Sequence, residues 1–476
     1  MSDAYRSYIG GEWLAGGDEI AVENPGTGEV FAAVARAGPD EVDRAVAAAR
    51  TCVADRRLTD MRPSARGRLL VDMARWIRDH EDEIVEVLTL DSGKTLLESR
   101  WEVAGGANFL EYYGGLADKI EGSYIPLGAG YIDYVTPVPY GVSAHIVPWN
   151  YPFELTCRGI GPALAAGNAV VVKSPELAPL SVTYVARAAE AAGMPRGAVN
   201  VMCGYGHDAG EALARHPGID QITFTGSVET GRKILYAAAE SVIPAVVELG
   251  GKSAGIVLDD ADLDQVTDQT RWGIFSNSGQ VCSALARLVV PARLHDEVVD
   301  RLVTMAGGLT VGPGIEGTDM GSLISGHQLE QVDRHVRAAG EDGASAAIGG
   351  ERIDRLGHFY QPTIFPNVTN DMAIARDEVF GPVLSVIPYG GVEEALRIAN
   401  DSDYGLVAGV FGNDLDQATF LADRLEAGQI FVNEWFQPSI EAPFGGFKRS
   451  GFGREKGADA VRGYYQLKNI NISRGS

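Results

Sequence analysis

The sequence predicts an α/β protein built from two doubly wound parallel-sheet domains and a small additional β element. From about residue 140, short runs rich in Val and Ile alternate with helical stretches, and the alternation resumes after about residue 255. Buried β-branched runs separated by helices are typical of doubly wound parallel sheets. The chain has 476 residues, more than one ordinary core accommodates, so its length also indicates two or three domains.

Both series divide into regular elements. The expected strands cover residues 142–147, 169–173, 198–202, 222–226 and 245–249 and then 286–292, 384–390 and 405–411, and the expected helices cover 181–193, 211–216, 229–241, 295–306 and 392–400. Such sheets bind ligands at the carboxyl ends of their strands, where glycine-containing turns lead into helices. We therefore expect the functional site at that edge.

Two further segments alternate polar and apolar residues, 131–139 and 464–473. They could pair as an outlying sheet, which is a common way to build a subunit interface. The other interpretation is that they are two ordinary edge strands, and the pattern does not choose between them.

Composition excludes several classes of partner. The chain has 64 acidic and 40 basic residues and a net charge of −24, which disfavours nucleic acid and anionic membranes. No apolar run approaches membrane-spanning length, and the first residues lack a signal-peptide core. Cys52, Cys157, Cys203 and Cys282 are scattered and not near histidines at ligand spacing, so we expect no metal site and no disulfide framework. A cytoplasmic protein is expected.

Two GxGxxxG patterns, at residues 204–210 and 451–457, do not by themselves predict a cofactor site. A dinucleotide fingerprint is GxGxxG placed directly between a strand and a helix. The first copy follows a strand but is one residue too long, and the second follows no expected strand.

Other motifs bring together residues suited to chemistry. FTGS at 224–227 ends a strand and opens a helix, whose free N–H groups favour an anion. VELGGKS places Glu248 at a strand end, and SGQVCSA places Cys282 in a glycine-containing loop 34 residues later. Upstream, VPWNYP supplies Asn150, and VVVKSPE supplies Lys173 and Glu176.

The motifs PWN, K-x-x-E, FTGS, ELGGK, GQ-x-C, E-x-FGPV and PFGG-x-K-x-SG-x-GRE, in this order, resemble the aldehyde dehydrogenase superfamily from Tyr8 to nearly the C-terminus. The resemblance implies three units. A Rossmann-like NAD-binding domain would cover 1–118 and 140–250, an α/β catalytic domain 251–460, and an oligomerisation element 119–139 and 461–476. It also implies a homodimer or homotetramer.

The resemblance assigns the catalytic roles. Cys282 would attack the aldehyde carbon, because a thiolate is a strong nucleophile and leaves well from a thioester. Asn150 and the backbone amide of Cys282 would stabilise the tetrahedral oxyanion. Glu248 would activate the water that hydrolyses the thioester, with a pKa that burial is expected to raise. The other three cysteines are expected to be small buried residues.

The resemblance also assigns the cofactor site. Lys173 and Glu176 would hold the adenosine ribose, and because the acid repels a 2′-phosphate, NAD⁺ is favoured, with NADP⁺ possible. The pyrophosphate would lie at the helix start, and the nicotinamide ribose and ring beside DEVFGPV. Trp149 would either line the cofactor crevice or pack in the core, and the sequence leaves both alternatives open. The remaining cofactor residues implied are Gly226, Ser227, Glu378 and Phe380.

The substrate is less determined. The resemblance implies a channel lined by Tyr151, Glu154, Leu155, Arg158, Val281, Ser283 and the loop 434–441, which includes Trp435 and Phe436. Arg158 favours a polar or anionic aldehyde, such as a semialdehyde or hydroxyaldehyde, since arginine binds carboxylates through two parallel hydrogen bonds. Alternatively it pairs with Glu154, one turn earlier on the helix. Gly159 stands where the family usually has lysine, and Trp435 and Phe436 favour an aromatic or aliphatic aldehyde instead.

Three other functions are weighed. CoA-acylating relatives generally lack the glutamate at the position of Glu248. A catalytically silent binding or structural homologue would have lost Cys282, Glu248 or Asn150. A cysteine hydrolase needs a histidine base, and none of the eight histidines lies in a recognisable motif. The sequence therefore predicts an NAD(P)⁺-dependent, non-acylating aldehyde dehydrogenase.

Overall fold

The computed structural model describes residues 5–436 and 439–474. Its first sheet has the strand order β2-β1-β9-β8-β7-β10-β11-β20, and the five strands from β9 to β11 run parallel. The strands, in this order, are Glu12–Leu14, Ser7–Ile9, Val199–Cys203, Ala169–Ser174, Val142–Ile146, Gln221–Thr225, Ala245–Glu248 and Gly451–Phe452. Their buried Val and Ile side chains explain the near-continuous apolar runs, because helices cover both faces.

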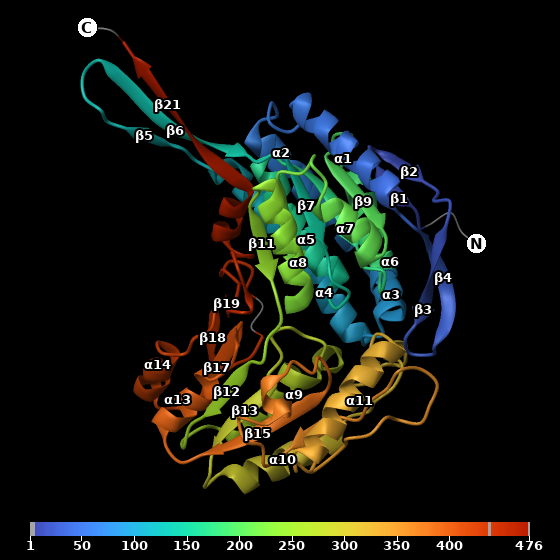
Figure 1. Cartoon of the computed structure of the whole chain (residues 1–476), viewed down its shortest axis with the longest axis vertical. Coiled ribbons are helices and arrows are strands. Elements are labelled where there is room, and N and C mark those ends of the chain that lie inside the picture. Colours follow the sequence, from blue (N-terminus) through green and yellow to red (C-terminus); the bar gives the residue numbers. More distant parts are fainter. Residues whose placement is uncertain (1–4, 437–438, 475–476) are drawn as a thin grey trace.

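Helices from the first half of the chain surround this sheet (Figure 1). They are α1 (Pro39–Ala54), α2 (Pro63–Asp79), α3 (Glu81–Ser92), α4 (Leu96–Leu116), α5 (Pro152–Ala166), α6 (Leu180–Ala191), α7 (Glu211–Ala214) and α8 (Val228–Ser241). Apolar residues of the helices and strands form one large core. The start of α4 is fixed by a capping box, in which Thr95 and Glu98 satisfy each other's backbone N–H groups.

The second sheet is entirely parallel, with the order β14-β15-β13-β12-β17-β18. These strands are Thr363–Phe365, Val383–Tyr389, Arg287–Pro291, Ala254–Val257, Val407–Phe411 and Gln429–Val432. The helices around it are α9 (Leu263–Phe275), α10 (His295–Gly307), α11 (Gly326–Glu341), α12 (Ala373–Arg376), α13 (Val392–Asn400) and α14 (Leu415–Ala422). The predicted α/β class with doubly wound sheets is confirmed.

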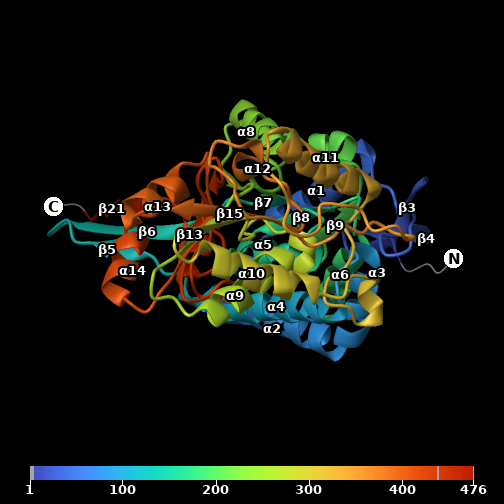
Figure 2. The same ribbon diagram turned by 90° about the horizontal axis from the view of Figure 1, so that it is seen from below.

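A third, antiparallel sheet projects from the body as an arm (Figures 1 and 2). It has the order β21-β6-β5, from Tyr465–Ser473, Tyr131–Pro139 and Ser123–Ile125. The register runs from Tyr465 opposite Pro139 to Ser473 opposite Tyr131, so the two alternating segments do pair as an outlying sheet. Two further antiparallel pairs complete the strands, β3 (Glu19–Asn24) with β4 (Glu29–Ala35) and β16 (Tyr404–Gly405) with β19 (Phe447–Lys448).

Several expected absences can be examined directly. All four cysteines are free. Within residues 5–436 and 439–474, no cluster of His, Cys, Asp or Glu could hold a metal ion. In the same residues, no helix combines the length and apolar character that crossing a bilayer requires.

Candidate active site

The site lies where the strand order of the first sheet reverses. Neighbouring strands β7 and β10 are followed in sequence by helices that lie in opposite directions along the sheet, α5 after β7 and α8 after β10. A crevice outside the carboxyl ends of the strands at such a point is where open α/β sheets bind ligands. Residues 149–150 follow β7, residues 226–227 follow β10, and Glu248 ends the adjacent strand β11.

Cys282 and Glu248 are brought together by close backbone approach at Gly251. A Cβ at Gly251 would overlap the carbonyl oxygen of Cys282, so only glycine lets the segment after β11 pass the cysteine loop. Glu248 is 1% exposed, and neither of its carboxyl oxygens has a hydrogen-bond partner among the described residues. Cys282 is partly exposed.

Burial disfavours the charged form of both side chains. Burial, reinforced by the nearby charge of Glu455, raises the pKa of Glu248 well above its usual value, as the sequence led us to expect. Burial also raises the pKa of the Cys282 thiol to about 12, which Arg158 partly opposes. The neutral form of each group is therefore favoured where it is buried.

Asn150 is fixed beside the cysteine loop by two hydrogen bonds. Asn150 Nδ2 donates to the carbonyl of Gln280 at 3.1 Å. The backbone carbonyl of Asn150 in turn accepts a hydrogen bond from Asn277 Nδ2, also at 3.1 Å. An Asn amide has two N–H donors, so the second remains for a ligand oxygen. Asn150 is therefore tied to the cysteine loop at Gln280, two residues before Cys282.

Two buried acids of α4 support these loops, and our sequence analysis identified neither of them. Glu98 Oε1 accepts the Asn277 amide at 2.6 Å, and Glu102 Oε1 accepts the Phe153 amide at 2.9 Å in the first turn of α5. Glu102 also forms a fully buried ion pair with Lys94. Glu98 and Glu102 are one turn apart and share a helix face, which could have suggested a common partner.

Lys173 and Glu176 meet at the carboxyl end of β8. Lys173 Nζ lies 2.7 Å from Glu176 Oε2, and the Gly206 amide donates to Oε1 at 3.4 Å. Burial raises the pKa of Glu176, but the charge and hydrogen bond of Lys173 prevail and lower it. The carboxylate is therefore ionised, and Gly206 of the first GxGxxxG pattern lies beside this pair.

Ser227 caps α8, with its Oγ accepting the Thr230 amide at 3.2 Å. The Gly226 amide donates to the carbonyl of Glu248 at 3.0 Å, which ties the start of α8 to the end of β11. A Cβ at Gly226 would lie 2.6 Å from the ring of Phe224. A helix start of this kind favours an anion, because N–H groups of the first turn have no partner within the helix.

Glu378 and Phe380 precede β15 of the second sheet, whereas Trp149 follows β7 of the first sheet, and these three residues lie at the crevice between the sheets. Glu378 Oε1 accepts the Gly251 amide at 2.9 Å, and burial raises the pKa of Glu378 to about 7. Phe380 has a φ of 53° and meets Trp149 edge to face, with ring centroids 5.3 Å apart. Trp149 is only partly buried, which favours the crevice over the core for this side chain.

The predicted channel residues divide into core and surface of the site. Trp435 is 4% exposed, and its Nε1 donates to the Ser283 carbonyl at 3.1 Å, so it packs within the core of the second sheet. Val281 and Ser283 are also buried, while Tyr151 and Phe436 are partly exposed. Within the loop 434–441, Gln437 and Pro438 lie outside the described residues.

Arg158 does not pair with Glu154. Its guanidinium forms an ion pair with Glu455, and each side chain is 6% exposed. The guanidinium carbon lies 5.2 Å from the centroid of the Phe444 ring. Glu455 belongs to the GRE sequence of the last motif, but sequence reasoning gave it no role.

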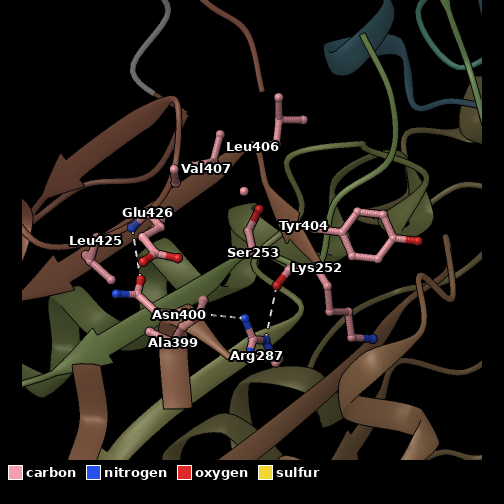
Figure 3. Close-up of a pocket in the computed structure, with 14 residues that line it drawn as sticks. Lys252, Ser253, Arg287, Ala399, Asn400, Tyr404, Leu406, Val407, Leu425 and Glu426 are labelled. Carbon is pink, nitrogen blue, oxygen red and sulfur yellow. Dashed lines mark hydrogen bonds between the residues drawn. The ribbon is translucent and has the colours of Figure 1, made fainter. Parts of the chain in front are cut away.

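Lys252 and Arg287 were also missed. Figure 3 shows a pocket at the start of β12 in which Arg287 donates to the carbonyls of Lys252 at 3.1 Å and Ala399 at 3.0 Å. Arg287 thus holds the segment between Glu248 and β12. The Lys252 side chain points away from this pocket (Figure 3), and burial with the charge of Arg287 lowers its pKa to about 7.

Comparisons with known proteins agree with this geometry. The family model described as the aldehyde dehydrogenase family matches residues 13–470. An aldehyde dehydrogenase of Aspergillus niger is 41% identical over 82% of this chain and 79% of its own length. The mitochondrial benzaldehyde dehydrogenase of Antirrhinum majus is 39% identical over 83% of this chain and 74% of its own length.

Solved structures are similar over nearly the whole chain. The NAD⁺ complex of a Bacillus cereus aldehyde dehydrogenase has a TM-score of 0.97 and 37% identity, covering 98% of this chain and 96% of that one. The betaine aldehyde dehydrogenase of Staphylococcus aureus in complex with NAD⁺ also has a TM-score of 0.97, with 34% identity over 99% of this chain and 95% of that one.

Proposed function

Because the chain belongs to the aldehyde dehydrogenase family, we propose that it oxidises an aldehyde to the carboxylic acid with NAD⁺ through a thioester on Cys282. The enzyme class is thus an oxidoreductase acting on aldehydes. The observation that carries the mechanism is the approach of Cys282 to the unpaired, buried Glu248 across Gly251. A silent homologue or a CoA-acylating enzyme has no use for this carboxyl.

The first half of the reaction falls to Cys282 and Asn150. The thiol gives its proton to solvent water, Sγ bonds to the aldehyde carbon, and the carbonyl oxygen becomes an oxyanion. Asn150 Nδ2 and the Cys282 backbone N–H donate to that oxyanion. When bound, NAD⁺ would supply the acceptor for the hydride of the same carbon, and loss of that hydride would leave a thioester on Cys282.

Glu248 acts in the second half. Its carboxylate accepts a proton from water, the water oxygen attacks the thioester carbon, and the C–S bond breaks to regenerate the Cys282 thiolate. The products are the carboxylic acid and NADH. Raised pKa values of Glu248 and Cys282 are the environment expected for groups that exchange protons during turnover.

The residues present fit NAD⁺. Lys173 and the ionised Glu176 would hold the adenosine ribose, and a 2′-phosphate would meet the charge of Glu176. Ser227, which follows Gly226 at the start of α8, would offer its N–H group to the pyrophosphate, while Glu378 would hold the nicotinamide ribose. The two similar structures that contain NAD⁺ support this choice. We retain the division into an NAD-binding domain (1–118 and 140–250), a catalytic domain (251–460) and an oligomerisation element (119–139 and 461–476) as part of the proposal.

For the substrate, we favour an uncharged aromatic or aliphatic aldehyde. Arg158 is already paired with Glu455, and the nearby side chains Tyr151, Phe436 and Phe444 are aromatic. The benzaldehyde dehydrogenase relative agrees with this class. A semialdehyde or hydroxyaldehyde is the second candidate, because the ammonium of Lys456 lies 5.1 Å from the Phe444 ring centroid without an ion pair in the described part of the chain.

The test is the initial rate of NADH formation with benzaldehyde, acetaldehyde, betaine aldehyde, glycolaldehyde and succinic semialdehyde. Cys282→Ala should lower the rate by at least about 10³-fold, because it removes the nucleophile. Cys52→Ala, which removes a buried thiol remote from the crevice, should leave the rate unchanged. Turnover that persists in Cys282→Ala would contradict the mechanism.

We further propose that the arm joins copies of this chain in a homodimer or homotetramer. It exposes Tyr124, Leu127, Tyr131, Leu467 and Ile472. Both of its outer strands, β5 and β21, also present an unpaired edge in the described chain. Light scattering coupled to size exclusion would measure the assembly, and a monomeric mass would contradict this proposal. A cytoplasmic location remains a prediction.

A further inference from the structure

Arg158 and Glu455 form an ion pair that is almost excluded from water, with each side chain 6% exposed. Two charges removed from water stabilise a site only if they neutralise each other, and removing one partner leaves the other buried and uncompensated. Arg158 Nε has no hydrogen-bond partner among the described residues, so Glu455 is its main anchor. The guanidinium is therefore held in one place.

The backbone fixes this pair beside Glu248. Phe444 and Glu455 exchange two backbone hydrogen bonds, of 2.6 and 2.7 Å. Gly445, the residue after Phe444, approaches Glu248 so closely that a Cβ at Gly445 would lie 2.9 Å from Oε1 of Glu248. The loop that carries Glu455 is thus packed against the carboxyl that is proposed to activate water.

The charges that face Glu248 come from three elements. Arg158 lies on α5, and Arg454, Glu455 and Lys456 lie on the C-terminal loop. The thiol of Cys282 comes from the loop after α9 and interacts electrostatically with Glu248 as well. Arg158 lowers the pKa of Glu248 and Glu455 raises it.

We propose that Arg158 is a positioning residue for the hydrolytic step. Arg158 neutralises the charge of Glu455, so that Glu248 alone accepts the proton of the attacking water. This inference rests on the proposed function and gives Arg158 a task other than holding an anionic substrate. Glu455 is the second residue of this arrangement. Without Glu455, Arg158 would be free to bind Glu248 directly and to hold Glu248 in an unreactive ion pair.

The neighbouring position explains why the cation comes from residue 158. A Cβ at Gly159 would lie 2.8 Å from Nδ1 of His145, whose ring is 2% exposed and packed in the first core. A side chain at position 159 would therefore overlap His145 unless that ring moved. In this chain, α5 instead directs a cation to Glu455 from the preceding residue, Arg158.

The experiment measures acylation and hydrolysis separately with p-nitrophenyl acetate, which needs no cofactor. The burst of p-nitrophenol reports acylation of Cys282, and the steady rate reports hydrolysis. Arg158→Met should retain a burst, although a slower one, because Arg158 also favours the Cys282 thiolate. It should move the pH midpoint of hydrolysis upward by about one unit and slow hydrolysis roughly tenfold below that midpoint. Glu455→Gln should move the midpoint downward. The double variant should hydrolyse faster than Arg158→Met alone.

Arg158→Lys is the matched variant, because it keeps the charge and should recover most of the hydrolysis rate. Thermal unfolding of each variant identifies a folding defect, and Glu455→Gln still tests the proposal if Arg158→Met fails to fold. Midpoints that do not shift, or that shift in the same direction, would overturn the proposal. So would a loss of kcat/KM with succinic semialdehyde but not benzaldehyde in Arg158→Met. A wild-type chain without any burst would instead contradict the proposed function.

Discussion

The two halves of the crevice treat their charged groups in opposite ways. In the cofactor half, Lys173 and Glu176 lie 2.7 Å apart, and Glu378 accepts the Gly251 amide at 2.9 Å. In the hydrolytic half, both oxygens of Glu248 lack a hydrogen-bond partner in the described chain, and the pKa of the Cys282 thiol is about 12. One half is satisfied without a ligand, whereas the other is not.

The difference follows from what each half is proposed to do. A binding surface is best preformed, because ordering it on binding would weaken affinity. A general base must instead gain and lose a proton, and burial without partners keeps its two protonation states closer in free energy at working pH. An unsatisfied buried polar group costs about 1–3 kcal/mol of stability. That cost is expected where chemistry occurs and not where a ligand is only held.

The largest effect is expected when Glu248, the proposed general base of the hydrolytic half, is replaced. Glu248→Gln should lower steady-state turnover by about 10²–10⁴-fold, because the general base is lost, while a burst of NADH remains. Since the amide resembles the protonated acid in charge and shape, the free energy of unfolding should change little. Rapid mixing of enzyme, NAD⁺ and benzaldehyde measures both phases.

Glu393→Gln, at an exposed position on α13, is the control and should behave as wild type. A missing burst in Glu248→Gln would mean that Glu248 is required before the thioester forms, which contradicts a role confined to hydrolysis.

A smaller effect is expected at Asn150, the polar group between the two halves. Asn150→Ala should slow the burst about 10²–10³-fold, since one oxyanion donor is removed from the tetrahedral state. Asn108→Ala, on the exposed side of α4, should have no effect. If only the KM for the aldehyde rises and the burst rate is kept, Asn150 binds substrate without stabilising the oxyanion.

Sequence and structure agree where a function depends on a few adjacent residues. The strand ends of the first sheet were predicted because apolar runs stop at motifs such as FTGS and VELGGKS, so Ser227 and Glu248 were placed correctly relative to their strands. The short strands β12, β14 and β18 were not predicted, because three or four residues carry too little periodicity.

The sequence could not predict contacts between distant charged residues. Arg158 was expected to hold a substrate or to pair with Glu154, yet its partner is Glu455, near the other end of the chain. Local spacing favours a partner one helical turn away, whereas burial selects the partner that tertiary packing supplies. Glu98 and Glu102 were not predicted for the same reason. Their partners are backbone amides of Asn277 and Phe153, and the local sequence of α4 does not indicate these distant contacts.

The smallest expected effect sharpens the comparison from the cofactor half. Glu176→Gln should raise the ratio of kcat/KM for NADP⁺ to that for NAD⁺ by about tenfold, which corresponds to about 1.4 kcal/mol, because the charge that repels a 2′-phosphate is removed and Lys173 becomes free to bind it. Steady-state kinetics with both cofactors measure this ratio, with Glu393→Gln on α13 as the matched acid. A paired group at a partly exposed site is screened by water, so its removal should change selectivity without abolishing turnover. A ratio that stays constant would place the adenosine ribose elsewhere, whereas a collapse of turnover would mean that the cofactor half also takes part in the chemistry.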